Sequence, residues 1–342
     1  MIRLSVLDQS VAVTGRSADA SIRETLALAQ HSEVLGYERF WVSEHHSHPT
    51  IVGSAPEVLM AAIAATTQRI RIGSAGVMLP HYSALKVAEQ FRVLEALAPG
   101  RIDLGVGRAP GSDGRTAQLL NPQARSAADH FPLQVRELQA WVGGKELPEG
   151  HPGRGVTAEP GGPTAPTLWM LGSSNYGAQL AAHYGLPYAF AYFITDGEGA
   201  EEALAMYREF YRPSPQHPQP QPALCVWALA ADTEDEAWRY FSSRERWKLD
   251  RNRGALAPLQ SPAEVALRPY NPAEQMQAEQ LRRTALVGSG PQVADKLRAL
   301  SEALGVEELV VITWAHDPAV RRRSYELLAA QFPSPARADG PK

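Results

Sequence analysis

Residues 39–48 read Arg-Phe-Trp-Val-Ser-Glu-His-His-Ser-His, an apolar segment followed at once by one acid and three histidines. Phe40–Val42 predicts a buried β-strand, and the polar residues after it predict a functional loop positioned by that strand. Two kinds of site fit this loop: a redox or acid–base site on His45, and a zinc site on Glu44 and the histidines. Successive side chains of an extended segment point to opposite sides, so His45 and His46 are poorly placed to bind one metal ion, and the first kind is favoured.

Short apolar segments alternate with amphipathic helical segments along the whole chain. Eight apolar segments are each followed by a helix signal, and we expect strands at residues 4–7, 40–42, 70–79, 102–107, 167–171, 188–194, 224–229 and 308–312. Strands that alternate with helices form parallel βαβ units, and eight units most simply close into a single α/β barrel, the (β/α)8 TIM barrel. An open doubly wound sheet is the alternative, although Asp8-Gln9-Ser10 stands where a Gly-rich dinucleotide fingerprint would follow the first strand.

Two segments interrupt this pattern. The Gly/Pro-rich residues 147–166 predict an excursion over the surface. After the seventh strand, residues 250–286 form the longest insertion. They are polar, carry five arginines and indicate an irregular lid that excludes water, or else a packed or disordered insertion. The sequence therefore predicts one barrel domain over residues 1–332 and a disordered tail over residues 333–342.

Composition argues against several classes of function. With 342 residues and a formal net charge of -4, the chain gives no electrostatic reason to expect nucleic acid as a partner. No apolar segment is long enough to cross a membrane, and no signal-peptide pattern follows Met1, so we expect a cytoplasmic protein. Cys225 is the single cysteine, which excludes an internal disulfide, and its apolar neighbours predict a buried, inert thiol.

The ends of the strands supply the candidate site, because a barrel of this type builds its active site at the carboxyl ends of its strands. After the fifth strand, Gly172-Ser173-Ser174 leads directly into a helix, whose first backbone N–H groups are a ready anion site. Arg108, at the end of the neighbouring strand, can reach the same place and bind a phosphate with two hydrogen bonds. The alternative is an ordinary helix cap and a surface arginine. The other strand ends suit a flat organic cofactor or an apolar substrate; they include Met78, Tyr82, Tyr192, Trp227 and Trp314.

Four segments occur in an order and at a spacing that can be compared with known families. They are residues 40–46 (FWVSEHH), 73–80 (GSAGVMLP), 100–108 (GRIDLGVGR) and 185–187 (GLP). Together they resemble the bacterial-luciferase-like flavin monooxygenases, and the turn at 107–113 is most similar to the single-subunit oxidoreductases of that family. The resemblance implies a (β/α)8 fold, reduced FMN supplied by a separate flavin reductase, and molecular oxygen. It further implies oxidation of a small organic substrate through a flavin C4a-peroxide. We also expect a homodimer.

The resemblance also implies roles for individual residues. Ala75-Gly76 corresponds to a non-prolyl cis peptide under the isoalloxazine ring, and Arg108 to a group that binds the FMN phosphate. His45 corresponds to an active-site histidine at the flavin edge, an acid–base group or hydrogen-bond partner, and Glu44 to a residue beside the ring. The implied cofactor-binding residues are Ala75, Gly76, Arg108, Gly172, Ser173 and Ser174.

Three alternatives remain open at this stage. The first is hydride transfer with the deazaflavin F420 in the same fold, and the second is a non-catalytic flavin-binding protein. The third is a metal-dependent barrel hydrolase. The sequence names no substrate and assigns no role to His46 or His48.

Overall fold

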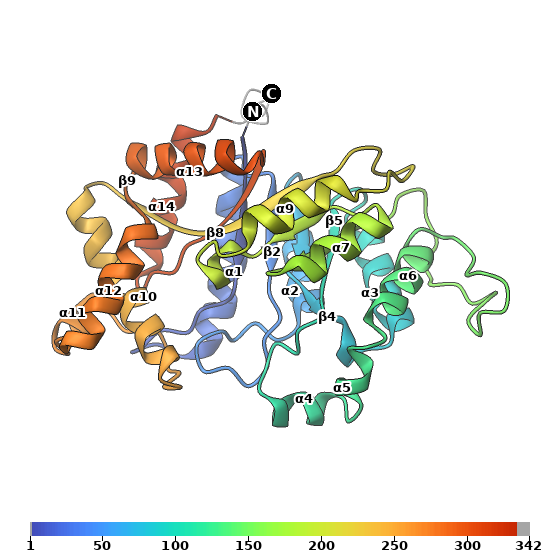
Figure 1. The fold of residues 1–342 in the computed structure, drawn as a ribbon, viewed down its shortest axis with the longest axis horizontal. Coiled ribbons are helices and arrows are strands. Elements are labelled where there is room, and N and C mark those ends of the chain that lie inside the picture. The colour runs from blue at the N-terminus through green and yellow to red at the C-terminus, as the bar shows by residue number, and fades with distance from the viewer. Residues whose placement is uncertain (1, 334–342) are drawn as a thin grey trace.

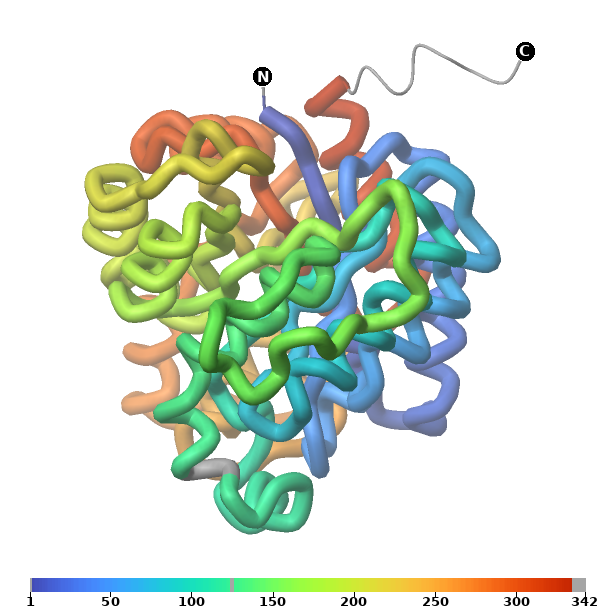
Figure 2. Tube along the Cα trace, turned by 90° about the vertical axis from the view of Figure 1, so that its right-hand side faces the viewer, coloured from blue at the N-terminus to red at the C-terminus, as the bar shows by residue number. Residues whose placement is uncertain are grey.

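The structure is a computed structural model that describes residues 2–333. Except for Pro333, the predicted disordered tail, residues 333–342, lies outside the described residues. The Gly/Pro-rich segment 147–166 runs over the outside of the molecule, as predicted, and appears as the long green loop at the front of Figure 2.

Within residues 2–333, eight parallel strands form a closed ring. They are β1 (Arg3–Asp8), β2 (Arg39–Val42), β3 (Arg71–Ser74), β5 (Ile102–Gly107), β6 (Thr167–Gly172), β7 (Tyr188–Phe190), β8 (Pro222–Ala231) and β10 (Glu308–Ile312). The ring closes because β10 pairs with both β1 and β8, with Val311 opposite Val226 in β8. The predicted (β/α)8 barrel is therefore confirmed, and the open doubly wound sheet is wrong.

Helices surround this barrel (Figure 1). The helices after successive strands are α1 (Ala18–Val34), α2 (Pro56–Thr66), α3 (Ala84–Leu97), α6 (Phe131–Val142), α7 (Asn175–Tyr184), α9 (Ala200–Glu209), α10 (Glu234–Asn252), α13 (Gly290–Leu304) and α14 (Pro318–Gln331). Local sequence sets their limits. The sequence Ser289-Gly290-Pro291 predicts a helix start, and Ser289 does cap α13 in a capping box with Pro291 in the first turn. Gly305 ends that helix with φ at 61°.

Two predicted strands are shorter than expected. The segment 70–79 divides into β3 and β4 (Val77–Met78), separated by the Ala75–Gly76 peptide and followed by the short helix η1 (Leu79–His81). The segment 188–194 stops as a strand at Phe190 and continues as the single turn α8 (Tyr192–Thr195). Apolar composition does not distinguish a strand from a turn that packs against the barrel mouth.

The sequence also predicts one helix over residues 126–141, and the structure divides this region. Its main part is α6, and two short helices precede it, α4 (Gly114–Leu120) and α5 (Ala124–Ala127). Asp113 caps α4 by accepting the Thr116 N–H at 2.9 Å.

The prediction of an irregular stretch at 250–286 is wrong. These residues form the end of α10, then α11 (Pro262–Ala266) and α12 (Pro272–Thr284), and β9 (Leu286–Ser289) pairs with the end of β8. Ser261 and Asn271 each open a helix with a capping box and a proline in the first turn, a pattern present in the sequence. The structure thus shows the packed insertion that was the alternative.

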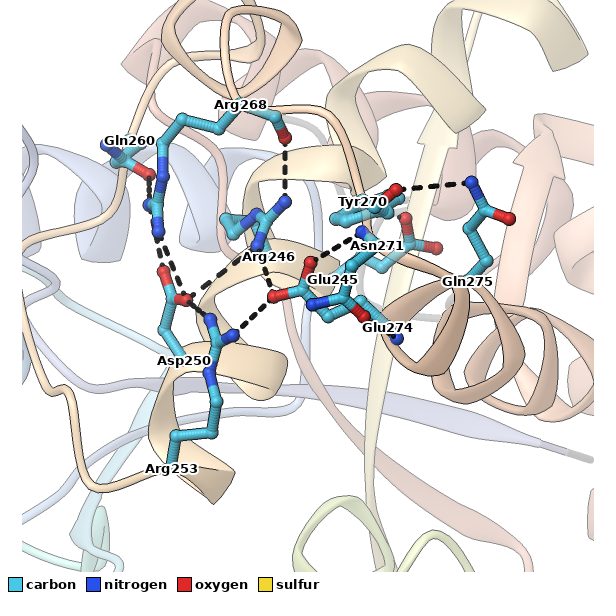
Figure 3. Close-up of polar contacts among 10 residues, drawn as sticks. All are labelled: Glu245, Arg246, Asp250, Arg253, Gln260, Arg268, Tyr270, Asn271, Glu274 and Gln275. Carbon is cyan, nitrogen blue, oxygen red and sulfur yellow. Dashed lines mark hydrogen bonds and ion pairs between the residues drawn. The ribbon is translucent and has the colours of Figure 1, made fainter.

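Ion pairs attach this insertion to α10 (Figure 3). Arg246 of α10 donates to the Glu274 carboxylate of α12 at 3.0 Å, and the fully buried Glu245 carboxylate accepts from Arg282 at 2.6 Å and from the Tyr270 hydroxyl at 2.8 Å. Because these partners lie on different helices, α10 is held rigidly where it crosses the mouth of the barrel.

The interior of the barrel is polar at its amino end. The buried Asp103 carboxylate accepts from Arg39 at 2.9 Å, from Arg71 at 2.6 Å and from the Trp41 indole at 3.0 Å, and Arg39 also donates to Glu308 at 2.6 Å. Burial by itself raises the pKa of Asp103, but the two arginines outweigh it and the pKa is lowered. Apolar side chains fill the next layer, among them Leu7, Trp41, Trp169, Cys225 and Val310.

Candidate active site

A cavity of about 450 Å³ lies at the carboxyl ends of the strands, above this apolar layer. A volume of about 300–1,000 Å³ is usual for sites that enclose a small organic ligand. Most of its wall is apolar, and its polar groups come from the loops after β2, β5 and β6 and from α10. The cavity therefore has the position that the fold predicts for an active site.

One end of the cavity has groups that could hold an anion. Gly172, Ser173 and Ser174 line it, and α7 begins directly after them. Within the described residues, the Ser174 side chain makes no capping hydrogen bond, so the first N–H groups of α7 are left for a ligand. The Arg108 guanidinium lies at the same end, stacked on the Tyr176 ring with 4.0 Å between its carbon and the ring centroid.

The Ala75–Gly76 peptide lines the cavity and is cis, as the resemblance implied. Gly76 has no room for a side chain, because an added Cβ would lie 2.9 Å from the Gly105 carbonyl oxygen and 2.6 Å from Cδ1 of Leu171. The backbone itself therefore forms this part of the wall, and a flat ring can approach it closely.

His45 and His48 line the cavity beside this peptide, with 5.9 Å between their ring centroids. Burial, with a smaller effect of His48 and His46, lowers the pKa of His45 to about 4, so its imidazole is neutral near pH 7. His48 accepts the N–H groups of Thr50 and Ile51 on Nδ1, at 3.1 and 3.0 Å, which places its ring proton on Nε2. The site therefore holds two neutral histidines in contact.

Glu44 and His46 turn away from the cavity. The Glu44 carboxylate is buried, bonds to the His46 ring at 2.7 Å, and accepts the Tyr82 hydroxyl at 2.6 Å and the Met78 N–H at 3.0 Å. Glu44 does not belong to the described lining of the cavity, and its expected place beside a bound ring stays a prediction. Its contacts make it a positioning residue for the loop that carries His45.

Of the other residues predicted at the strand ends, some line the cavity and some do not. Met78, Trp227 and Trp314 line the cavity, whereas Tyr82 and Tyr192 are not among the described lining residues. Cys225 is buried, as expected, and burial raises its pKa, but it does line the cavity. Among the described residues, no group of three or more His, Cys, Asp or Glu side chains is arranged to hold a metal ion.

Sequence reasoning missed the contribution of α10. Arg244, Trp247, Lys248 and Arg251 all line the cavity. Their spacing places them on one face of the helix, which was a visible signal, but nothing local shows that this face meets the barrel mouth.

A TIM barrel with an apolar cavity at the carboxyl ends of its strands has the architecture of an enzyme that encloses a small organic ligand. Residues 2–308 match the family model described as luciferase-like monooxygenase. The protein YwcH of Bacillus subtilis is 45% identical over 97% of this chain and 99% of its own. The N-acetyl-S-alkylcysteine monooxygenase of the same organism is 37% identical over 96% of this chain and 98% of its own.

A comparison with solved structures gives the same family. Apo-MsnO8 superposes with a TM-score of 0.88 at 37% identity, over 97% of this chain and 98% of that one. The chain therefore belongs to the luciferase-like monooxygenase family, and the predicted monooxygenase class is confirmed at that level. Two more distant structures show the fold alone: a 3,6-diketocamphane monooxygenase with FMN (TM-score 0.70, 21% identity) and an F420-dependent secondary alcohol dehydrogenase (TM-score 0.66, 15% identity).

In the described part of the chain, no helix combines the length and the apolar character that a membrane span requires.

Proposed function

We propose that the protein is an FMN-dependent monooxygenase that uses reduced FMN and O2 to oxidise a small organic substrate. The observation that carries this proposal is that Arg108 and the open N-terminus of α7 share one cavity with Gly76, where the backbone alone forms the wall and a flat ring can lie against it. A metal-dependent hydrolase would need a ligand cluster at the same mouth, and the wall is aromatic there instead.

The residues present fit the flavin. Arg108, Ser173, Ser174 and the N–H groups opening α7 would hold the phosphate, since a dianion is favoured at a helix N-terminus next to a guanidinium. The Ala75–Gly76 backbone would support the ring system. Reduced flavin supplies two electrons and activates O2, of which one atom enters the substrate and the other leaves as water.

The protein's own groups position and protect this chemistry. His45 would act from its neutral form, either accepting a proton or hydrogen-bonding to the reacting oxygen, because its lowered pKa keeps it uncharged at pH 7. Trp227, Trp247 and Trp314 would exclude water and contact the apolar part of the substrate. Glu44 would fix the loop through its bonds to His46 and Tyr82.

Two further parts of the proposal rest on the family resemblance. A separate flavin reductase would deliver the reduced FMN, and two copies of the chain would form a homodimer. An N-acetyl-S-alkylcysteine is the first substrate to try, on the ground of the relative that carries that name.

The test is a flavin titration of the purified protein under reducing conditions, followed by mixing with oxygen and N-acetyl-S-benzylcysteine. We expect micromolar binding of reduced FMN and formation of an oxygenated product. Binding of F420 in place of FMN would instead support an F420-dependent enzyme that transfers hydride. If neither cofactor binds at micromolar concentration, the proposed function fails.

A further inference from the structure

The cavity that holds the proposed flavin site is strongly cationic. Arg108, Arg244, Lys248 and Arg251 line it, and its described lining includes no aspartate or glutamate. Arg108 belongs with the phosphate end. The other three cations all lie on α10, at positions i, i+4 and i+7, and form a second charged wall beside Trp227 and Trp247.

The α10 cations differ in their partners. Lys248 is already neutralised, because its Nζ donates to both carboxylate oxygens of Asp196 at 2.5 and 2.6 Å. Arg251 is exposed at the rim, with its guanidinium carbon 5.9 Å from the centroid of the Trp247 ring. One carboxylate therefore faces three cations, and this wall keeps an excess of positive charge.

Arg244 is the buried member of the wall. Only 8% of the residue is exposed, and its guanidinium lies over the Trp227 ring with 4.3 Å between its carbon and the ring centroid. Among the described residues, no carboxylate or carbonyl accepts a hydrogen bond from Arg244, whose guanidinium carries five N–H donors, and none of its nitrogens is fully enclosed by protein. The guanidinium is therefore open to the cavity, where an anion can accept its N–H groups.

The surroundings of Arg244 have the electrostatic character expected of a ligand site. Burial lowers the pKa of the Arg244 guanidinium, the Asp196 carboxylate opposes that shift, and Arg251 adds to it. The Trp227 indole N–H beside it is likewise buried, with no acceptor among the described residues. A cation open to the cavity thus stands beside an aromatic wall, which suits a ligand with one anionic group on an apolar body.

We propose that Arg244 anchors a carboxylate of the substrate, so that the substrate class is an organic acid whose apolar part lies against Trp227, Trp247 and Trp314. This inference rests on the proposed function, since it assumes that the flavin phosphate occupies the Arg108 end. The ion pairs of Glu245 and Arg246 with α12 hold α10 in place, so Arg244 is already positioned before a substrate binds.

The experiment compares acids with their neutral amides. Calorimetry on the FMN-loaded protein measures the Kd of two matched pairs: N-acetyl-S-benzylcysteine with its amide, and octanoate with octanamide. At least one acid is expected to bind about 10- to 100-fold more tightly than its amide. In Arg244→Met that preference is expected to vanish, while the amide and FMN affinities stay within about twofold. Arg239→Met is the matched control, because Arg239 is exposed on the same helix and stacks on Tyr240 outside the cavity.

Several results would overturn the proposal. They are the absence of acid binding at millimolar concentration, equal binding of acid and amide, and a preference that survives in Arg244→Met. Loss of FMN binding in Arg244→Met would also overturn it, by assigning Arg244 to the flavin. If that variant does not fold by circular dichroism, Arg244→Lys carries the test: it keeps the charge without the two-pronged donor, and the preference should shrink at least about threefold. An unchanged preference refutes the role.

Different results would refute the monooxygenase proposal and the proposal for Arg244. Flavin affinity is measured in its own titration, and the acid–amide comparison is repeated on protein without flavin. A protein that binds no flavin but still prefers the acids through Arg244 refutes the monooxygenase proposal alone.

Discussion

Replacing Arg108 with alanine isolates the phosphate part of flavin binding. A hydrogen bond to a charged group is worth about 1.5–3 kcal/mol, or a factor of about 10–150 in Kd. Arg108 is exposed, so solvent and salt screen its charge, and the N–H groups of α7 still face the phosphate in the variant. We therefore expect the Kd of FMN to rise about 10- to 30-fold, at the lower end of that range.

Riboflavin separates the charge of Arg108 from its packing. Arg108 also stacks on Tyr176, and alanine removes that contact as well. Fluorescence titrations of FMN and of riboflavin, which lacks the phosphate, are compared in the parent and in Arg108→Ala. The loss should appear with FMN and be small with riboflavin, and it should decrease as salt is raised.

The matched control is Arg115→Ala, since Arg115 is exposed on α4 and does not belong to the described cavity lining. An FMN affinity that is unchanged in Arg108→Ala would remove Arg108 from the phosphate site. Equal losses for FMN and riboflavin would show that Arg108 acts by packing on Tyr176, and the reasoning from charge would be refuted.

Three further changes test other parts of the structure. In the parent, the folded-state pKa of His45 is about 4, below the ordinary value of about 6.5, so the unfolded state binds a proton first as the pH falls. The parent should therefore lose up to about 3 kcal/mol of folding stability between about pH 6.5 and pH 4. His45→Asn should not show this loss. Asp103→Ala should lower the free energy of unfolding by about 3 kcal/mol in urea denaturation, because it removes the buried carboxylate that Arg39 and Arg71 share. Glu245→Gln should weaken the docking of α12 by about 1–3 kcal/mol, seen as faster proteolysis within Pro272–Thr284.

Each of these has its own control. The His45 effect is the difference between parent and variant at each pH, which removes carboxylates that titrate in both; a constant difference from pH 4 to 7 would contradict it. Asp103→Asn keeps the volume and should fall between parent and alanine, whereas a stability equal to the parent would contradict the ion-pair argument. Glu279→Gln, on the exposed side of α12, should leave proteolysis unchanged, and equal rates for Glu245→Gln and the parent would show that the docking does not depend on Glu245.

Much of the fold was readable from the sequence because its signals are local. The period of apolar residues placed the strands, and the Ser289–Pro291 pattern placed the start of α13. The capping boxes at Ser261 and Asn271 were equally local, and reading them would have replaced the irregular stretch by α11 and α12. That error came from giving polar composition more weight than cap geometry.

The site was predicted in part for the same reason. Because parallel strands of a barrel all end at one face, the sequence predicted that His45, Arg108 and the Ser173–Ser174 turn lie together at the barrel mouth. Family resemblance added the cis Ala75–Gly76 peptide. The direction of each side chain within a loop was not predictable: Glu44 is buried and accepts the Tyr82 hydroxyl, a contact that no local pattern indicates.

The sequence by itself thus determined the barrel and the loops that carry its polar groups, because periodicity and capping act over a few residues. Only the tertiary structure decided which groups share the cavity. Arg244 meets Trp227, and Lys248 meets Asp196, across distances in the chain that no local pattern spans. Packing of α10 over the barrel mouth brings those residues together, and it leaves the buried charge of Arg244 facing the cavity.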